Sequence, residues 1–456
     1  MRETLEREVK LRAGEAFELP ELGGETIEPR VFDSTYHDSR DHRLAQHEVT
    51  LRHRVENGKG LWQLKLPRGV ARLELEAEGR PTKPPEKMLT LLPAYLRGAK
   101  LVPVARLRTR RTGVRVDGAE VVHDSVSVLD DERVSRSFDE LEVELIEGDE
   151  KALRRIEKAL RRAGAGDGEQ RPKVFQALDL EYEREPAAAA KDASAGEALR
   201  AQLALQYERL LAHDPGTRLG TDPEDLHQFR VATRRLRAFL RAGQELLDPE
   251  WAGPLREDLR WLGGALGPVR DLDVLIEHLT AEVDALGPER DAARPLVQLL
   301  QRRRRSARTR LRAALESDRY FELLDLLERP APTVAEGVTL AQIESREHRK
   351  LRQAIRALTD ESADAELHEA RIKTKRARYA AELAGDTAYV KAAKVLQDVL
   401  GEHQDTVVAA DRLRELATRS PETSLAIGRL LERELSRAAE CRAEWPRAWK
   451  KLVRVA

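Results

Sequence analysis

Three charged residues near the start of the chain, Glu6, Glu8 and Lys10, occupy alternate positions in the stretch LEREVKLRAG at 5–14. Side chains two residues apart point to the same face of a β-strand, so a strand here places two carboxylates and an ammonium on one side. Carboxylates bind Mg²⁺-type ions, and an ammonium binds phosphate oxygens as a point charge. In a single strand, this alternation is also typical of the solvent-facing side of an ordinary sheet.

Same-face charges recur along the first 184 residues, with acids on some stretches and bases on others. They are Glu74 and Glu76; Glu140, Glu142 and Glu144; Arg52 and Arg54; Arg106, Arg108 and Arg110; and Lys65 in WQLKL. If the sheet curls into a barrel with these faces inward, its lumen is charged. Its cations would bind the phosphates of a short polyphosphate and its carboxylates would hold divalent metal, one ion clamping the phosphates and another polarising a water.

The elements that position these residues differ between the two halves of the chain. Up to about residue 184 the period is two, with Gly and Pro between antiparallel strands and helices expected over 84–96 and 149–164. An Ala-rich stretch, REPAAAAKDASAGE, then reads as a linker, and the period becomes 3.6 from about residue 195. We therefore predict a strand domain over 1–184, a linker over 185–196 and a helical domain over 197–456.

The helical half contains an internal repeat. LHQFRVATRRLR at 226–237 recurs as LHEARIKTKRAR at 367–378, and LGPVRDLDVL at 266–275 has an echo in LGEHQDTVVA at 400–409. A helical unit duplicated in tandem, over about 197–330 and 335–456, explains this pattern.

The repeated stretch places cations on one helix face. At about 100° per residue, one stripe spans roughly 80° in each copy. The first copy contributes His227, Arg230, Arg234, Arg237 and Arg241, and the second contributes His368, Arg371, Lys375 and Arg378. Phe229, Leu236, Phe239 and Leu240 take the opposite face of the first copy.

A solvated face is the ordinary interpretation of a charged helix, but such faces mix signs because like charges repel. No acid occurs from His227 to Arg241, so a polyanion that relieves the repulsion explains the stripe better. For the two histidines, phosphate contact or a structural hydrogen bond is favoured over metal ligation. A further run, QRRRRSARTRLR at 301–312, goes nearly all round its helix and partly reads as plain surface.

Composition narrows the function classes. Lys and Arg total 80 against 81 Asp and Glu, so the net charge of −1 gives no global attraction to nucleic acid or membranes. Aromatic residues make up 4%, which argues against stacking platforms, and the single cysteine, Cys441, excludes a disulfide framework. Without a signal peptide or a long apolar run, we expect a cytoplasmic protein, with polyphosphate granules as a place of association.

Both halves resemble known families. EREVKL resembles the ExExK signature of the CYTH domain, the triphosphate tunnel metalloenzyme fold, and YHDSRDHRL, LRHR, LWQLKLP, LELE and ELEVEL follow in that family's order. The second half resembles a CHAD domain, a duplicated helical histidine-containing module, through LHQFRVATRRLR and LHEARIKTKRAR. The two domains commonly occur fused in this order in bacteria. The resemblance implies an α+β multidomain chain, with an eight-stranded antiparallel tunnel before two duplicated helical bundles.

The resemblance also implies roles for residues of the tunnel. Metal, Mg²⁺ or Mn²⁺, would be held by Glu6, Glu8, Glu76, Glu142, Glu144 and Asp124. Triphosphate would be held by Lys10, Arg52, Arg54, Lys65, Arg108 and Arg110. Glu6, Glu8 and Lys10 would be catalytic. The register of the strand around Arg106–Arg111 leaves Arg111 as an alternative to Arg110, and RPKVF offers Lys173 through a weaker match.

The leading hypothesis is a metal-dependent inorganic triphosphatase, a phosphoanhydride hydrolase that cleaves tripolyphosphate to pyrophosphate and phosphate. The helical domain would bind long-chain polyphosphate. Three alternatives stay open: a nucleoside- or thiamine-triphosphatase or adenylate cyclase, a non-catalytic polyphosphate-binding scaffold, and nucleic acid as the ligand of the basic stripes.

Overall fold

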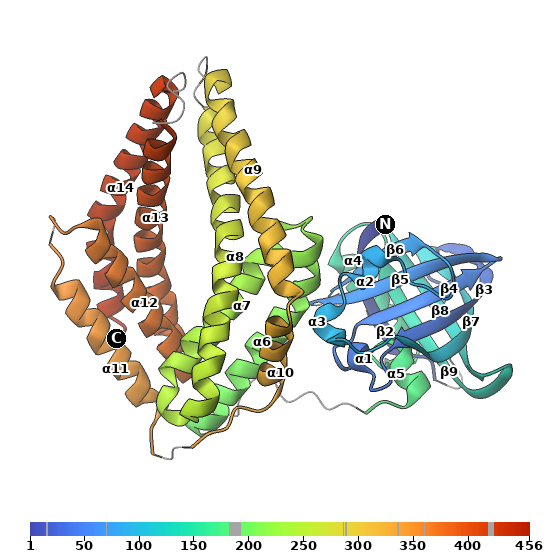
Figure 1. The fold of residues 1–456 in the computed structure, drawn as a ribbon. Coiled ribbons are helices and arrows are strands. Elements are labelled where there is room, and N and C mark those ends of the chain that lie inside the picture. The colour runs from blue at the N-terminus through green and yellow to red at the C-terminus, as the bar shows by residue number, and fades with distance from the viewer. Residues whose placement is uncertain are drawn as a thin grey trace. The chain divides into compact units, whose positions relative to one another are not determined.

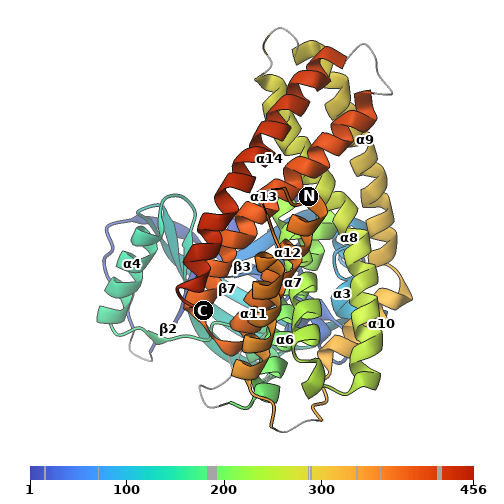
Figure 2. The same cartoon turned by 90° about the vertical axis from the view of Figure 1, so that its left-hand side faces the viewer.

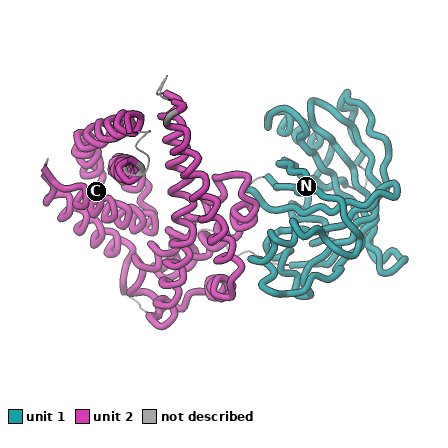
Figure 3. Tube along the Cα trace, turned by 45° about the horizontal axis from the view of Figure 1, so that its top comes forward, with its two compact units in different colours: residues 1–184 teal, residues 185–456 magenta. Residues whose placement is uncertain are grey.

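The computed structural model of the chain forms two compact units, Met1–Arg184 and Glu185–Ala456, which Figure 3 colours separately. It describes residues 1–14, 17–69, 71–181, 193–285, 287, 290–334, 337–359, 361–417 and 424–456. Most of the expected linker, 185–196, lies outside the described residues. Its last residues begin helix α6, which starts at Ala195.

A single antiparallel sheet makes up most of unit 1 (Figure 1). Its strands are β1 (Arg2–Glu6), β2 (Glu8–Arg12), β3 (Glu25–Asp38), β4 (Thr50–Glu56), β5 (Lys59–Arg68), β6 (Ala71–Glu78), β7 (Val102–Val116), β8 (Ala119–Asp130), β9 (Arg133–Leu145) and β10 (Gly166–Asp167). They are ordered β1-β6-β5-β4-β3-β7-β8-β9-β2-β10. Since β1 and β2 are separated only by Arg7, the N-terminal stretch pairs with β6 on one side and β9 on the other, which closes the sheet into a barrel.

The predicted antiparallel tunnel is thus confirmed, although the sheet has ten strands rather than eight. Two local features account for the difference. The break at Arg7 divides one barrel position into β1 and β2, and β10 is a pair of two residues added beside β2.

Alternation places charge inside this barrel and apolar residues outside. On β9, Leu141 and Val143 are fully buried under the amphipathic helix α4 (Glu150–Arg162), while the residues between them face the lumen. Because a slip of one residue would exchange the two faces, burial of both sides specifies the register strongly. The other helices of unit 1 are short: α1 (Arg43–Gln46), α2 (Glu86–Leu89), α3 (Pro93–Leu96) and α5 (Lys173–Leu178).

Unit 2 is built of helices, with one short 3₁₀ turn and an isolated bridge between Leu247 and Thr333 among its described residues. The helices are α6 (Ala195–Leu219), α7 (Pro223–Ala242), α8 (Pro249–Asp284), α9 (Arg290–Leu315), α10 (Asp318–Glu328), α11 (Leu340–Arg356), α12 (Asp364–Ala384), α13 (Thr387–Ala417) and α14 (Ser424–Val453). Figures 1 and 2 show α8–α9 and α13–α14 as two long antiparallel pairs, which apolar residues near Leu279 and Leu430 join. No helix in the described ranges is long and apolar enough to cross a membrane.

The apolar face expected for the first repeated helix is confirmed. Phe229, Leu236, Phe239 and Leu240, all on α7, are completely buried. Phe239 packs edge-on against Tyr379 of α12, with ring centroids 6.1 Å apart, so the two copies of the repeated helix lie against one another.

Helix α4 offers a test of how much this outer layer stabilises unit 1. Leu160→Ala removes a completely buried side chain that packs against the strands, so we expect the free energy of unfolding of unit 1 to fall by about 2–5 kcal/mol. Lys158→Ala, on the exposed side of the same helix, should change it by less than about 0.5 kcal/mol. Urea unfolding measures both, and equal effects would contradict the assigned packing.

Candidate functional site

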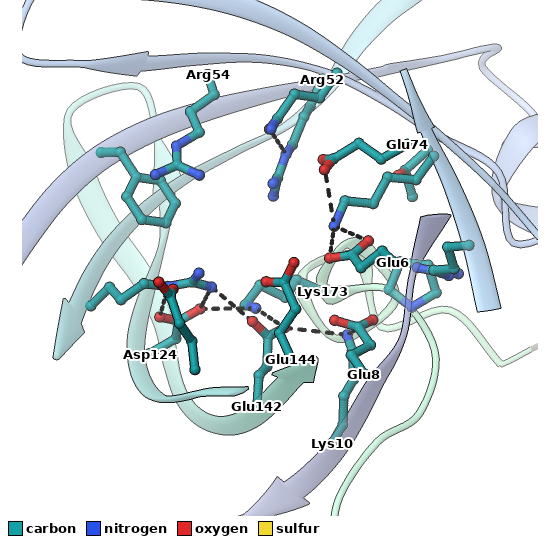
Figure 4. A pocket seen from close by; sticks show the side chains of 18 of the residues that line it. Glu6, Glu8, Lys10, Arg52, Arg54, Glu74, Asp124, Glu142, Glu144 and Lys173 are labelled. Atoms are coloured by element: carbon teal, nitrogen blue, oxygen red, sulfur yellow. Dashed lines mark hydrogen bonds and ion pairs between the residues drawn. The ribbon is translucent and has the colours of Figure 1, made fainter. Parts of the chain in front are cut away.

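A charged cavity of about 230 Å³ opens inside the barrel of unit 1 (Figure 4). Among the predicted site residues, those that line it are Glu6, Glu8, Lys10, Arg52, Arg54, Lys65, Glu76, Asp124, Glu142 and Glu144. Every strand from β1 to β9 contributes at least one lining residue, so alternation along the closed sheet is what gathers charges from distant parts of the sequence.

One group of these charges is a fully paired ionic network. Lys173 Nζ, from α5, lies 3.0 Å from Asp124, 2.5 Å from Glu140 and 2.5 Å from Glu142. Arg111 contacts both oxygens of Asp124 at 2.7 and 2.6 Å and Glu142 at 2.7 Å. Burial disfavours the charge of Glu142, but Lys173 and Arg111 outweigh it and hold its pKa well below the usual range. Asp124 and Glu142 are therefore ionised and neutralised by fixed cations.

A second group, Glu6, Glu8 and Glu144, carries an excess of negative charge. Glu6 binds Lys65 Nζ through both oxygens at 2.6 Å, whereas Glu8 lies 3.9 Å from Lys10 Nζ. Burial and, next, the nearby charge of Glu6 raise the pKa of Glu144 to about 7. A carboxyl group that titrates near neutrality can take up or release a proton under cellular conditions.

Arginines of β4 face these carboxylates across the cavity (Figure 4). Arg52 donates to Gln63 at 2.8 Å and to the Tyr36 hydroxyl at 3.1 Å, and the described residues include no carboxylate in ion-pair contact with it. Arg54 pairs with Glu56 at 2.5 Å. Burial, together with the charges of Arg52 and Arg111, lowers the pKa of Arg54 to about 10. An anion bound between these guanidinium groups would relieve their repulsion.

The carboxylate group is chemically suited to a divalent metal ion. Among the described residues, no three His, Cys, Asp or Glu side chains already stand in metal-binding positions. The donors nevertheless fit, because Glu6, Glu8 and Glu144 crowd negative charge into one buried region whose excess a hard cation would relieve. Mg²⁺ and Mn²⁺ prefer such oxygens together with water and substrate phosphates.

Cations of the two repeats converge in unit 2 on a second charged cluster, which we call the repeat cluster: Arg230, Arg234, Arg371 and Lys375. Arg230 lies 3.3 Å from Asp271 of α8. The charge of Asp405 of α13 attracts Arg371 and acts to raise its pKa. Asp271 and Asp405 are equivalent positions of the shorter sequence echo, so each repeat contributes the same arrangement. Burial, together with the charges of Arg371, Arg234 and Arg230, lowers the pKa of Lys375 to about 7.

Comparison with known proteins agrees with this two-part geometry. The CYTH domain family matches residues 4–173 and the CHAD domain family matches residues 201–414. Two uncharacterized Mycobacterium tuberculosis proteins, MT2285 of strain CDC 1551 and Rv2226 of strain H37Rv, are each 31% identical over 471 residues, covering 92% of this chain and 89% of theirs. This is a CYTH–CHAD protein.

Two solved structures each align with more than half of the chain. PptA from Streptomyces chartreusis aligns with 57% of this chain and all of its own, at 23% identity and a TM-score of 0.50. The CHAD domain from the plant Ricinus communis aligns with 60% of this chain and 96% of its own, at 30% identity and a TM-score of 0.49.

The prediction was wrong for two residues of the CYTH tunnel. Arg108 and Arg110, expected to hold triphosphate, lie on the outer face of β7, and Arg108 is 55% exposed and bound to Asp33 at 2.9 Å. Arg111 lines the cavity instead. Arg111 lines the cavity and Thr109 is opposite Phe32, which also lines it, so the odd-numbered positions of β7 face inward. Arginine at both 110 and 111 leaves the alternation pattern without a signal for the correct face.

The tunnel also contains residues that the prediction left out or weighed lightly. Lys173 comes from α5, outside the strand pattern, and is 7% exposed. Gln63 bridges Arg52 and Glu76, donating to the carboxylate at 2.7 Å. Alternation on β5 with Lys65 was the available signal for Gln63, since the two lie two residues apart.

The CHAD stripes are only partly assembled as predicted. Arg237 lies near Arg256 and Arg260 of α8, and Arg241 near Arg376, away from the repeat cluster. Arg378 is 8% exposed and stacks on Tyr379 with its guanidinium 4.6 Å from the ring centre. Since it is buried, Arg378 supports packing and is not presented to a ligand.

The two predicted histidines take different places beside the stripes. Burial lowers the pKa of His227, and the charges of Arg270, Arg234 and Arg230 lower it further. His227 is therefore neutral at pH 7 and borders the repeat cluster. Nδ1 of His368 is buried and has no hydrogen-bond partner among the described residues.

The arginine run on α9 is largely structural. Arg304 pairs with Asp273, Arg303 with Glu415, and Arg308 and Arg312 donate to the backbone carbonyls of Gly220 and Arg218. These bonds hold α9 against its neighbours, so the density of positive charge in the sequence overstates its availability for ligands.

Lys375 provides a pH test of the repeat cluster. Its folded pKa of about 7 lies below the unfolded value of about 10.4, so the unfolded chain binds the extra proton between these pH values. The free energy of unfolding should therefore rise from about pH 7 to about pH 10, and Lys375→Met should remove that rise. Urea unfolding across this range measures it. Lys391→Met, on an exposed part of α13, should keep the wild-type pH dependence; loss of the rise there too would contradict the assignment.

Proposed function

We propose that the CYTH domain is a metal-dependent inorganic triphosphatase and that the CHAD domain binds inorganic polyphosphate. The observation that carries the proposal is the division of the tunnel cavity. Arg52 and Arg54 stand on one side without enough carboxylate to balance them, and Glu6, Glu8 and Glu144 crowd together in excess. A triphosphate with divalent metal ions satisfies both halves at once.

The contacts of each tunnel residue suggest its role in the proposed reaction. Glu6 and Glu8 would hold Mg²⁺ or Mn²⁺, which when bound neutralises phosphate charge and acidifies water. Arg52 and Arg54 bind the phosphate chain, and Lys65 orients Glu6 through its contacts with both oxygens. Lys10, at 3.9 Å from Glu8, 3.7 Å from Glu142 and 3.2 Å from Glu140, fixes the position of the carboxylates. Because it also lines the cavity, Lys10 stays a proposed contact of the phosphate chain.

The reaction is hydrolysis of a terminal phosphoanhydride bond. Glu144 accepts a proton from the attacking water while the water oxygen forms a bond to the terminal phosphorus. The bond from that phosphorus to the bridging oxygen breaks, and the electron pair leaves with pyrophosphate. Arginine charge stabilises the oxygens that become more negative as the bond breaks. Three carboxylates support the tunnel wall in this scheme, because each already has a partner in the protein. Arg111 binds Asp124, Lys173 binds Glu142, and Gln63 donates to Glu76.

Removing one carboxylate charge tests the tunnel. Glu6→Gln should lower phosphate release from tripolyphosphate by at least about 100-fold, because it weakens metal binding and releases Lys65. The measurement is a malachite-green screen over tripolyphosphate, ATP, thiamine triphosphate and long polyphosphate, with Mg²⁺ and with Mn²⁺.

The matched control is Glu132→Gln, at an exposed turn between β8 and β9, which should keep wild-type activity and melting temperature. Turnover retained by Glu6→Gln would refute the site. Faster phosphate release from ATP or thiamine triphosphate than from tripolyphosphate would refute the substrate. Formation of cyclic AMP from ATP would identify a cyclase instead.

The CHAD domain is proposed to bind long polyphosphate at the repeat cluster. Two arginines with lowered pKa, Arg230 and Arg371, come from equivalent positions of the two repeats and repel one another in the absence of ligand. A flexible chain of phosphates relieves this repulsion without needing bases or sugars to be recognised. We keep a cytoplasmic location, with association with polyphosphate granules, as part of this proposal.

A charge reversal tests the repeat cluster. Arg371→Glu should weaken binding of long-chain polyphosphate by at least about tenfold at 0.1 M salt and flatten the dependence of log K on log salt. Arg302→Glu, on the exposed side of α9, carries the same charge change and should have less than a threefold effect. Equal losses would mean that only net charge matters. Displacement of polyphosphate by DNA at equal phosphate concentration would favour nucleic acid as the ligand.

A further inference from the structure

Phe32 is an aromatic side chain inside an otherwise polar tunnel. It lies on β3, lines the cavity and is 3% exposed. Two guanidinium groups lie over its ring. The guanidinium carbon of Arg54 is 3.7 Å from the ring centre, and that of Arg111 is 5.7 Å away. A guanidinium over an aromatic face is attracted by the ring's negative quadrupole.

The sheet order explains why both arginines reach the same ring. β3 lies between β4, which carries Arg54, and β7, which carries Arg111. In the register, Arg54 is opposite Ser34 and Arg111 is opposite Arg30, each two residues from Phe32. Diagonal neighbours on one face of a sheet are within reach of long side chains.

The two arginines do not depend on the ring equally. Arg111 is already held by three short contacts to Asp124 and Glu142. Arg54 has one carboxylate partner, Glu56, and shares its surroundings with the like charges of Arg52 and Arg111. Phe32 is thus a principal partner that orients the Arg54 guanidinium within the cavity.

The same contacts bear on which triphosphates the tunnel accepts. Among the described lining residues the aromatic ones are Phe32 and Tyr36, and Tyr36, 4% exposed, accepts a hydrogen bond from Arg52 through its hydroxyl. Both rings are therefore buried and engaged with arginines. Neither presents an open face on which a nucleobase would stack.

We propose that Phe32 is a positioning and specificity-determining residue: its ring holds Arg54 toward the phosphate chain and, being covered by guanidinium groups, denies a stacking surface to nucleotides. This inference rests on the proposed triphosphatase function and narrows its substrates to phosphate chains without a base. Phe32 acts through Arg54 and need not touch the reacting atoms.

The test compares a changed ring, a missing ring and a retained ring at position 32. Phe32→pentafluorophenylalanine keeps the size but reverses the quadrupole, Phe32→Leu removes the ring, and Phe32→Tyr keeps it. We expect the first two to raise the KM for tripolyphosphate by about 3- to 30-fold with kcat within twofold of wild type, and Phe32→Tyr to restore most of the affinity. In an Arg54→Met background the Phe32 changes should have no further effect. Circular dichroism and melting temperature report folding of each variant.

Binding without turnover separates this proposal from the reaction itself. Calorimetry with tripolyphosphate and with ATP, in chelator, uses the full chain carrying Arg230→Glu and Arg371→Glu to weaken the CHAD site. The chain with wild-type Phe32 should bind ATP no more tightly than tripolyphosphate. In the pentafluoro variant, the affinity for tripolyphosphate should fall by about 3- to 30-fold. If no triphosphate is hydrolysed, the proposed function fails while this binding arm still decides the role of Phe32.

Two results would overturn the inference. One is wild-type affinity and KM in the pentafluoro variant, or losses that persist undiminished in the Arg54→Met background. The other is ATP binding more than tenfold tighter than tripolyphosphate, which would require a base-recognising surface in the tunnel.

Discussion

The closure of the N-terminal sheet is the constraint on which the tunnel depends. The stretch from Arg2 to Arg12 pairs with β6 through β1 and with β9 through β2, and the break at Arg7 lies between the two pairings. Glu6 and Glu8 therefore stand on either side of the closing seam. Only a closed sheet brings Glu144 of β9 and Lys65 of β5 to the same pair of carboxylates, so the charge distribution of the cavity is a consequence of the seam.

Charge inside the barrel is tolerated because most of it is paired. Lys173 and Arg111 neutralise Asp124 and Glu142, and their removal would leave buried carboxylates without partners. Two regions depart from this balance, the carboxylates around Glu144 and the arginines of β4. The proposed chemistry is located where pairing stops. Burial, together with neighbouring like charges, shifts the pKa values of Glu144 and Arg54 in these two regions.

Much of this site could be predicted from period-two alternation, because a closed sheet sends every second side chain inward. Glu6, Glu8, Lys65 and Glu142 followed from that rule together with the family resemblance. The rule failed at Arg108 and Arg110, since β7 carries cations on both faces and alternation alone does not say that Arg111 is the one that faces the cavity. A helical contribution such as Lys173 escapes any strand rule.

For the helical half, the sequence predicts individual helices but not how they pack together. Helix periodicity identified the stripes and their apolar faces, but sequence alone does not say which helices pack together. The convergence of Arg230 with Arg371 depends on α7 lying against α12, as the Phe239–Tyr379 contact shows. Tertiary packing also diverts Arg378 into the interior and ties much of the α9 run to carbonyls and acids.

The internal repeat has a further consequence for the kind of polymer that suits the repeat cluster. Arg230 and Arg371, with Asp271 and Asp405, are supplied by equivalent positions of two copies, so the cluster has approximate twofold character. A nucleic acid has a chemical direction and presents different groups to the two halves. Inorganic polyphosphate is the same from either end, so under the proposed function both orientations of the chain would make nearly equivalent contacts. Lys375 opposite Arg234 is the one place in the cluster where the two directions would differ.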